Sequence, residues 1–376
     1  MLKKLDKWLV ICTFILLVIG LVMIFSASNV TSYMTYSKSP YNFFLRQLIF
    51  LIGSLILAFF ILKINTKSYH YSSFLLMLII MGLLGVVLVY GKMTNKARSW
   101  FNLFGLITIQ PSEFAKIITI VWFSCYYSLK KNCNDLKKVL FPLLMSLGIA
   151  LLIAIQPDLG TTILYVGIVF MIFVILPINK KIKRNSFLGV IGIIIISLLL
   201  LLNNGVKILF DRQIERFDFL KPCEKIYSTG NQVCNGYIAI NNGGLFGRGL
   251  GNSTQKYLYL PEAYTDFIFA IVVEELGVIV SIGILLLMFI ILWRIFLIAK
   301  RSKTTRGSIL CYGIFWYILL HIIINLGGLL GLMPLTGVPL PFLSYGGSYL
   351  MCLLSSIAIV LRIDLENKEG KINGKK

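Results

Sequence analysis

The sequence predicts an all-α integral membrane protein with ten transmembrane helices. Hydrophobic residues make up 58% of the 376-residue chain and charged residues only 14%, whereas a soluble domain carries about 25% charged residues. The apolar residues gather in ten stretches near the length of about 20 residues that a helix needs to cross a bilayer. None of them alternates polar and apolar residues with period two, which excludes a transmembrane β-barrel. The predicted spans are 8–26, 44–62, 71–90, 110–128, 139–156, 160–178, 186–204, 265–298, 307–331 and 343–362.

The distribution of basic residues predicts how these spans are oriented. The chain has 36 Lys and Arg residues and a net charge of +21, and 23 of the 36 lie in alternate connections or in the terminal segments. Because cytoplasmic connections are enriched in Lys and Arg, this set is predicted to be cytoplasmic, together with both termini. The positive charge therefore reflects topology, with attraction to anionic lipid as a second contribution, and does not indicate nucleic-acid binding.

The two ends of the chain carry separate predictions. The first span follows Lys3, Lys4 and Lys7 and lacks a small-residue cleavage site, so it is interpreted as a retained helix rather than a cleaved signal. Residues 1–362 are predicted to form a single polytopic membrane domain. Residues 363–376 are charged and are predicted to be a disordered cytoplasmic tail.

The longest predicted outward connection is a large loop over about 203–264, between the seventh and eighth spans. It is polar and Gly-rich, and it is longer than a connector needs to be, so a functional loop is expected. Cys223 and Cys234 lie in it, on the side of the membrane where a disulfide is allowed, but their spacing leaves the pairing open. The segment GGLFGRGLG, 243–251, lacks the Gly-Lys-Ser/Thr ending of a phosphate loop and is interpreted as a flexible hinge or a close-packing surface.

Few ionisable residues fall at bilayer depth, where each costs roughly 2.5–3.5 kcal/mol on insertion scales and so needs a partner or a function. Glu113 and Lys116, at the start of the fourth span, have the i, i+3 spacing of an ion pair. Asp158 follows Gln-Pro between the fifth and sixth spans and is placed to cap the sixth. Asp266 follows Thr265, a predicted cap, at the start of the eighth span. It is interpreted either as a helix-stabilising charge or as a half-shielded base.

The remaining polar groups in the spans are assigned structural roles. Glu274 and Glu275 lie about 12–14 Å deeper than Asp266 along the same helix, which is too far for a carboxylate pair, so we expect them to face a polar interior or another helix. The two histidines, His70 and His321, have no neighbouring Cys, His or acid at metal-ligand spacing.

Taken in order, several segments resemble the SEDS family of bacterial cell-wall polymerases, the FtsW, RodA and SpoVE type. The resemblance covers nearly the whole chain. Three positions depart from the family pattern: Lys96 stands where Gly is usual, Tyr264 where His or Gln is usual, and His321 where Gln is frequent. The matching segments are ARSW (97–100), IQPSEFAK (109–116), QPDLGTT (156–162), NNGGLFGRGLGNSTQKYLYLPEAYTDFIFA (241–270), EELG (274–277) and NLGGLLGLMPLTGVPLPFLSYGGS (325–348).

The resemblance implies a peptidoglycan glycosyltransferase, which polymerises lipid II into glycan strands at the outer face of the bacterial cytoplasmic membrane. It places the essential aspartate of the family at Asp266. Because a sugar hydroxyl is a poor nucleophile and a pyrophosphate must depart, the chemistry needs a base, here Asp266, and positive charge. A divalent cation, Mg²⁺ or Mn²⁺, is a candidate cofactor without assigned ligands. The candidate substrate-binding residues are Arg98, Trp100, Glu113, Lys116, Asp158, Arg248, Lys256 and Ser344, with Arg98, Lys116, Arg248 and Lys256 assigned to the pyrophosphate.

The resemblance also implies partners and leaves alternatives open. The expected partners are lipid II, a class B penicillin-binding protein that crosslinks the strand, other division or elongation proteins, and membrane lipid. The run QKYLYLPEAYTDFIFAI favours a role in division or sporulation over elongation. A lipid II flippase and a scaffold for the penicillin-binding protein are the alternative functions. The clustering of polar residues at one end of the spans argues against a flippase, which needs a continuous polar path.

Overall fold

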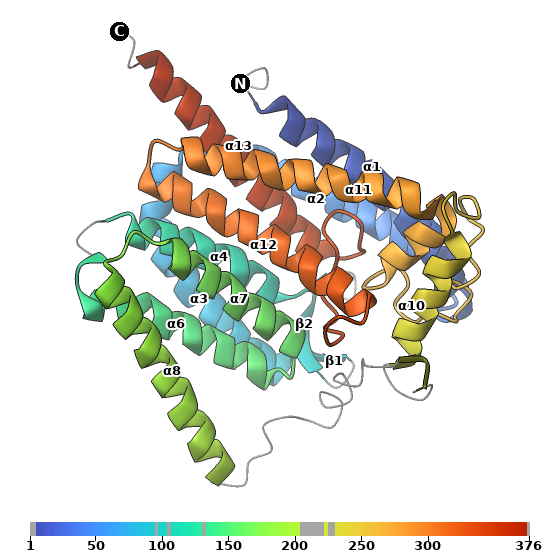
Figure 1. Cartoon of the computed structure of the whole chain (residues 1–376), viewed down its shortest axis with the longest axis horizontal. Coiled ribbons are helices and arrows are strands. Elements are labelled where there is room, and N and C mark those ends of the chain that lie inside the picture. The colour runs from blue at the N-terminus through green and yellow to red at the C-terminus, as the bar shows by residue number, and fades with distance from the viewer. Residues whose placement is uncertain are drawn as a thin grey trace.

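The computed structural model describes residues 5–94, 97–103, 107–129, 133–203, 222–224 and 230–373, and long helices dominate it (Figure 1). A helix covers most of each predicted span, and seven helices of the described part are long and apolar enough to cross a membrane. The protein is therefore a multi-pass membrane protein, while the number of ten spans and their orientation remain predictions. The helices over the predicted spans are α1 (Lys7–Met34), α2 (Asn42–Lys63), α3 (Tyr69–Tyr90), α4 (Pro111–Tyr127), α6 (Leu136–Ile155), α7 (Leu159–Ile175), α8 (Lys180–Asn203), α11 (Ile268–Arg301), α12 (Thr305–Leu329) and α13 (Gly347–Asn373).

The helices pack side by side, with α13 inside the bundle and α2 at its edge. α13 runs along α2 and also contacts α4, α11 and α12. The apolar part of α13 is almost wholly buried, whereas little of α2 is buried although it is equally suited to span a membrane. We infer that α2 turns most of its apolar surface to lipid. α8 diverges from the bundle and contacts α6 (Figure 1).

A small antiparallel sheet, which the sequence analysis did not predict, precedes α4. Its strands are β1 (Lys92–Thr94), β2 (Ala97–Leu103) and β3 (Ile107–Ile109), in the order β1-β2-β3. The strands contain Thr, Ile, Trp and Phe, which fit a pleated and half-buried surface. The all-α prediction therefore holds for the membrane-spanning part and was incomplete for this connection.

α13 does not end where the predicted tail begins. The helix continues to Asn373, so the prediction of disorder over 363–376 is wrong as far as residue 373. Glu366 accepts hydrogen bonds from the backbone N–H of Thr66 at 2.8 Å and from its hydroxyl at 2.6 Å. Arg362 pairs with Glu366 at i, i+4. Such pairs support a helix whose composition alone resembles a disordered tail.

α11 is broken at Gly277, where φ is 82° and ψ is 168°. Residues 244–256, here called the docked loop, follow α10 (Gly230–Gly243) and reach into this break. Two carbonyls before the break accept from the docked loop, and two amides after it donate to the loop, so the groups freed by the break are satisfied. The bonds are Arg248 N to Glu274 O at 2.9 Å, Gly249 N to Glu275 O at 3.0 Å, Val278 N to Gly244 O at 3.0 Å and Ile279 N to Leu245 O at 3.3 Å.

The docked loop packs tightly rather than acting as a hinge. At Gly247, whose φ is +78°, an added Cβ would lie 2.3 Å from the carbonyl oxygen of Glu275. At Gly243 an added Cβ would lie 2.1 Å from the carbonyl oxygen of Val273. Only glycine allows this approach of two backbones, which favours the close-packing interpretation of the GGLFGRGLG segment.

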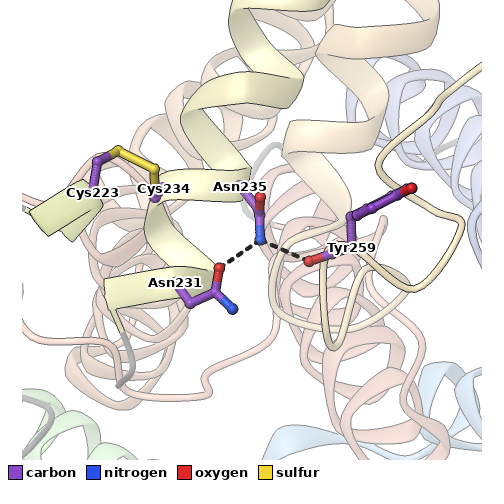
Figure 2. The surroundings of a disulfide bond; sticks show 5 residues. All are labelled: Cys223, Asn231, Cys234, Asn235 and Tyr259. Carbon is purple, nitrogen blue, oxygen red and sulfur yellow. Dashed lines mark hydrogen bonds between the residues drawn. A yellow bond between two sulfur atoms is a disulfide. The ribbon is translucent and has the colours of Figure 1, made fainter. Parts of the chain in front are cut away.

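The large loop that was predicted to face outward contains the disulfide that the sequence left open. Cys223, in the short helix η3 (Pro222–Glu224), is bonded to Cys234 of α10 (Figure 2). At the next residue of α10, the Asn235 amide donates to the Asn231 side chain and to the Tyr259 carbonyl, both at 2.8 Å. α10 is thus fastened at one side to η3 and at the other to the chain that leads into α11. Residues 204–221 and 225–229 of the predicted loop lie outside the described residues.

Candidate active site

A cavity of about 460 Å³ lies at the end of the bundle that the charge pattern predicts to face outward. Its wall combines the starts of α4 and α7, the strand β2, the turn before α11 and the segment before α13. Among the described residues, the wall holds four carboxylates and no Lys or Arg. The four are Glu113, Asp158, Glu262 and Asp266.

Asp266 lies half-buried in the turn just before α11, so Thr265 does not cap the helix as predicted. Side chains from distant segments hold the backbone on both sides of it. Asn325 Nδ2 donates to the Asp266 carbonyl at 2.9 Å, and Ser344 Oγ donates to the Thr265 carbonyl at 2.6 Å. The carboxylate faces Gly337, where an added Cβ would lie 3.4 Å from Asp266 Oδ2. The cavity therefore contains a carboxylate whose backbone position is fixed.

Asp158 caps α7, as predicted, and also lines the cavity. Its Oδ1 accepts from the Thr161 N–H at 3.1 Å, and its Oδ2 accepts from the Thr161 hydroxyl at 2.8 Å. The Gln110 amide donates to Oδ2 at 3.1 Å. Asp158 can cap the helix and line the cavity at the same time because α7 begins at the cavity.

Glu113 and Lys116 form the predicted ion pair, with Lys116 Nζ 2.7 Å from Glu113 Oε1. Both side chains are buried, but only Glu113 lines the cavity, and Lys116 lies behind it. Lys116 Nζ is also 3.2 Å from His321 Nε2. In the described part of the protein, Glu113 Oε2 has no hydrogen-bond partner. An unpaired buried carboxylate oxygen is costly unless a ligand satisfies it.

The two candidates on β2 lie differently with respect to the cavity. Trp100 lines the cavity, where its ring could contact a sugar face. Arg98 is exposed and is not part of the described wall. Of the two, only Trp100 lies on the same cavity wall as the carboxylates.

The two basic candidates of the docked loop do not line the cavity. Lys256 Nζ pairs with Glu275 at 3.1 Å and donates to the Gly251 carbonyl at 2.5 Å. Arg248 donates to the Asn242 carbonyl at 3.2 Å. Both groups hold the docked loop and lie away from the cavity wall, where the pyrophosphate was expected. As expected, Glu275 faces another helix, since the Ser26 hydroxyl of α1 donates to it at 2.7 Å.

Ser344 does not line the cavity either, although it was a candidate for substrate binding. Its hydroxyl accepts from the Leu340 N–H at 2.8 Å while donating to the Thr265 carbonyl. It therefore links the segment before α13 to the turn that carries Asp266.

The residues that the sequence analysis missed include one polar residue of the cavity wall and one that contacts the wall. Gln110 lines it and holds Asp158. Arg46 of α2 interacts with the side chain of Tyr345, another wall residue. Arg46 is a lone charge within an apolar span, so the rule that singled out Lys116 would also have found it.

Comparison with known proteins gives matches along the whole length. The family model named FTSW_RODA_SPOVE and described as cell cycle protein matches residues 7–369. Stage V sporulation protein E of Bacillus subtilis (strain 168) is 40% identical over 367 residues, which cover 95% of this chain and 96% of that relative. The probable peptidoglycan glycosyltransferase FtsW of the same organism is 38% identical over an alignment of 383 residues, gaps included. The alignment covers 99% of this chain and 94% of the relative.

Two solved structures share the fold. One is a chain of a peptidoglycan synthase complex, with a TM-score of 0.75, 24% identity and coverage of 96% of this chain and 98% of that one. The other is the rod shape determining protein RodA of Thermus thermophilus, with a TM-score of 0.68, 24% identity and coverage of 96% and 97%. From the family match and the relatives at 38% and 40% identity, we conclude that this chain belongs to the FtsW, RodA and SpoVE family of cell cycle proteins.

Proposed function

We propose that this protein is a peptidoglycan glycosyltransferase that polymerises lipid II at the outer face of the bacterial cytoplasmic membrane. The name of the Bacillus subtilis relative, a probable peptidoglycan glycosyltransferase, supports the proposal. The observation that carries it is the position of Asp266, a half-buried carboxylate on the wall of a cavity at the predicted outer end of the bundle. A lipid-linked sugar reaches such a cavity directly from the bilayer.

The reaction needs a base because the acceptor sugar hydroxyl is a poor nucleophile at neutral pH. Asp266 takes the proton of that hydroxyl as its oxygen attacks the anomeric carbon of the donor. The bond between the anomeric carbon and the pyrophosphate oxygen breaks, and undecaprenyl pyrophosphate leaves with the electron pair. The hydrogen bonds to the Asp266 and Thr265 carbonyls keep the base in place, which favours a reactive geometry.

Trp100 and Asp158 are proposed to bind the sugars. Aromatic side chains offer a flat apolar face, and Trp100 is half-buried on the cavity wall. Asp158 is already held by Thr161 and Gln110, so it presents its carboxylate in one orientation.

The departing pyrophosphate needs positive charge, and no Lys or Arg lines the cavity among the described residues. We assign this role to a divalent cation, Mg²⁺ or Mn²⁺, which when bound neutralises the phosphate oxygens. Mg²⁺ is commonly held by one or two carboxylates together with substrate phosphates. Glu113, with its unpaired Oε2 on the cavity wall, fits that description and leaves Asp266 to act as the base. In the described residues no group of three His, Cys, Asp or Glu could hold a metal without the substrate.

The same proposal includes a partner and a pathway. The fold match to a chain of a peptidoglycan synthase complex supports a class B penicillin-binding protein as the partner that crosslinks the strand. The relatives named FtsW and Stage V sporulation protein E support division or sporulation as the pathway. A tagged copy that localises to the septum supports this assignment, and one along the side wall contradicts it.

Polymerisation of lipid II by purified protein, with its penicillin-binding protein present, tests the function. Asp266→Asn removes the base at constant size, and we expect the rate to fall by at least about a hundredfold. Asp135→Asn is the matched control, because Asp135 is an exposed helix cap on the predicted cytoplasmic side and Asn caps equally well. A wild-type rate for Asp266→Asn would refute the base assignment.

The two alternative functions, flippase and scaffold, predict different results. Transfer of lipid II across vesicles without any glycan product would favour a flippase. Normal growth of cells that carry Asp266→Asn would favour a scaffold.

A further inference from the structure

His321 is a buried histidine that the proposed reaction does not use directly. It lies on α12 with no exposed surface, between the Tyr317 and Tyr349 rings, whose centroids are 4.9 and 4.6 Å from its own. Its two ring nitrogens face different partners. Nδ1 lies 3.2 Å from the Pro339 carbonyl oxygen, and Nε2 lies 3.2 Å from Lys116 Nζ.

These partners determine which nitrogen of His321 carries the proton. A carbonyl oxygen can only accept, so Nδ1 must carry a hydrogen and donate it to Pro339. Lys116 is an ammonium paired with Glu113, which can only donate, so Nε2 must accept and carry no hydrogen. The imidazole is therefore neutral and in the Nδ1–H form, because a hydrogen on Nε2 would oppose the ammonium.

The same face of α12 contacts the backbone of Asp266 and the lysine that pairs with Glu113. Asn325, one turn after His321, donates to the Val338 carbonyl at 2.8 Å and to the Asp266 carbonyl at 2.9 Å. His321 contacts the next residue of that segment, Pro339, and through Lys116 it reaches Glu113. α12 thus ties the segment before α13 to Asp266 on one side and to the Lys116–Glu113 pair on the other.

We propose that His321 is a positioning residue, which as a neutral Nδ1–H imidazole fixes Lys116 and thereby places the Glu113 carboxylate in the cavity. Without it, Lys116 loses one of its two close polar contacts, and its buried ammonium moves with Glu113. Glutamine can replace it, since its amide offers one donor for Pro339 and one acceptor for Lys116. The part of this inference that concerns catalysis rests on the proposed function, and the part that concerns the tautomer does not.

The tautomer is tested by ¹⁵N NMR of histidine-labelled protein in lipid bilayers. The chain has only two histidines, so His70→Gln leaves His321 as the single imidazole. His70 is exposed at the opposite end of the bundle from the cavity, at the start of α3. We expect the spectrum of a neutral ring protonated at Nδ1. An imidazolium, or a ring protonated at Nε2, overturns the proposal whether or not the protein polymerises lipid II.

The positioning role is tested by lipid II polymerisation with His321→Gln, His321→Leu and the control His70→Gln. We expect the two Gln variants to keep kcat within about threefold, and His321→Leu to lose about ten- to a hundredfold in kcat with little change in KM. If His321→Leu does not fold, His321→Asn replaces it, because the shorter amide does not reach both partners. Equal kcat values for the Leu or Asn variant and the Gln variant overturn the positioning role.

Discussion

Lys256 Nζ lies 3.1 Å from Glu275 Oε1, and both side chains are almost completely buried. Glu275 comes two residues before the break of α11 at Gly277, so this ion pair fastens the docked loop to the broken helix. The Ser26 hydroxyl of α1 donates to the same carboxylate at 2.7 Å. Three segments, α1, the docked loop and α11, thus meet at the carboxylate of Glu275.

Lys256→Met is expected to lower the stability of the protein strongly. Removal of one member of a buried ion pair costs about 3–5 kcal/mol, because the other charge is left uncompensated. Thermal unfolding in detergent measures the effect, and the double variant Lys256→Met, Glu275→Gln should recover part of the lost Tm. Lys138→Met is the control, since Lys138 pairs with Asp135 at 3.8 Å in an exposed position and its removal should leave the Tm unchanged. A wild-type Tm for Lys256→Met is the outcome that contradicts the interpretation.

Gly277→Ala should also destabilise the protein, through the backbone. Its φ is +82°, and an added Cβ would lie 2.4 Å from the Leu245 carbonyl oxygen of the docked loop. Gly283→Ala, in the same helix, is the matched control, because no atom of the described residues lies within 4 Å of its added Cβ. There the substitution should raise stability by up to about 1 kcal/mol, as alanine favours a helix interior. Similar Tm values for the two variants would rule out the proposed docking of the loop.

Ser344→Ala is expected to reduce both stability and polymerisation, although Ser344 does not line the cavity. The change leaves the Leu340 N–H and the Thr265 carbonyl without their partner, at about 1–3 kcal/mol for each buried group, and it loosens the turn that carries Asp266. Ser356→Ala is the control, since Ser356 is buried but only donates to the Leu353 carbonyl within its own helix. The prediction fails if the two alanine variants behave alike.

The disulfide predicts how many cysteines of the chain react with an alkylating reagent. Seven cysteines are present, and Cys12, Cys125, Cys133, Cys311 and Cys352 are free. The protein is purified from the membrane of the cells that produce it, denatured, and alkylated without reductant. It should then carry five labels per chain, one on each free cysteine. Reduction should raise the number to seven and separate the peptides of Cys223 and Cys234 in mass spectrometry. Seven labels without reductant would show that the bond does not form.

The sequence by itself determined the features that depend on neighbouring residues. The ten apolar ranges follow from side-chain hydrophobicity alone, and a helix covers most of each. The Glu113–Lys116 pair and the Asp158 cap are local contacts, three residues apart, which helix geometry dictates. Asp266 was identified through the motif around it, and it lies on the cavity wall.

Only the tertiary structure decided which distant groups meet. Lys256 and Arg248 were assigned to the pyrophosphate because the reaction needs positive charge, and the fold gives them Glu275 and the Asn242 carbonyl as partners. His321 and Lys116 are 205 residues apart, and Ser344 and Thr265 are 79 apart. Hydrophobic pattern and helix period indicate where each span lies along the chain. The partner of a polar group across the bundle depends on how the helices pack, which neither pattern specifies.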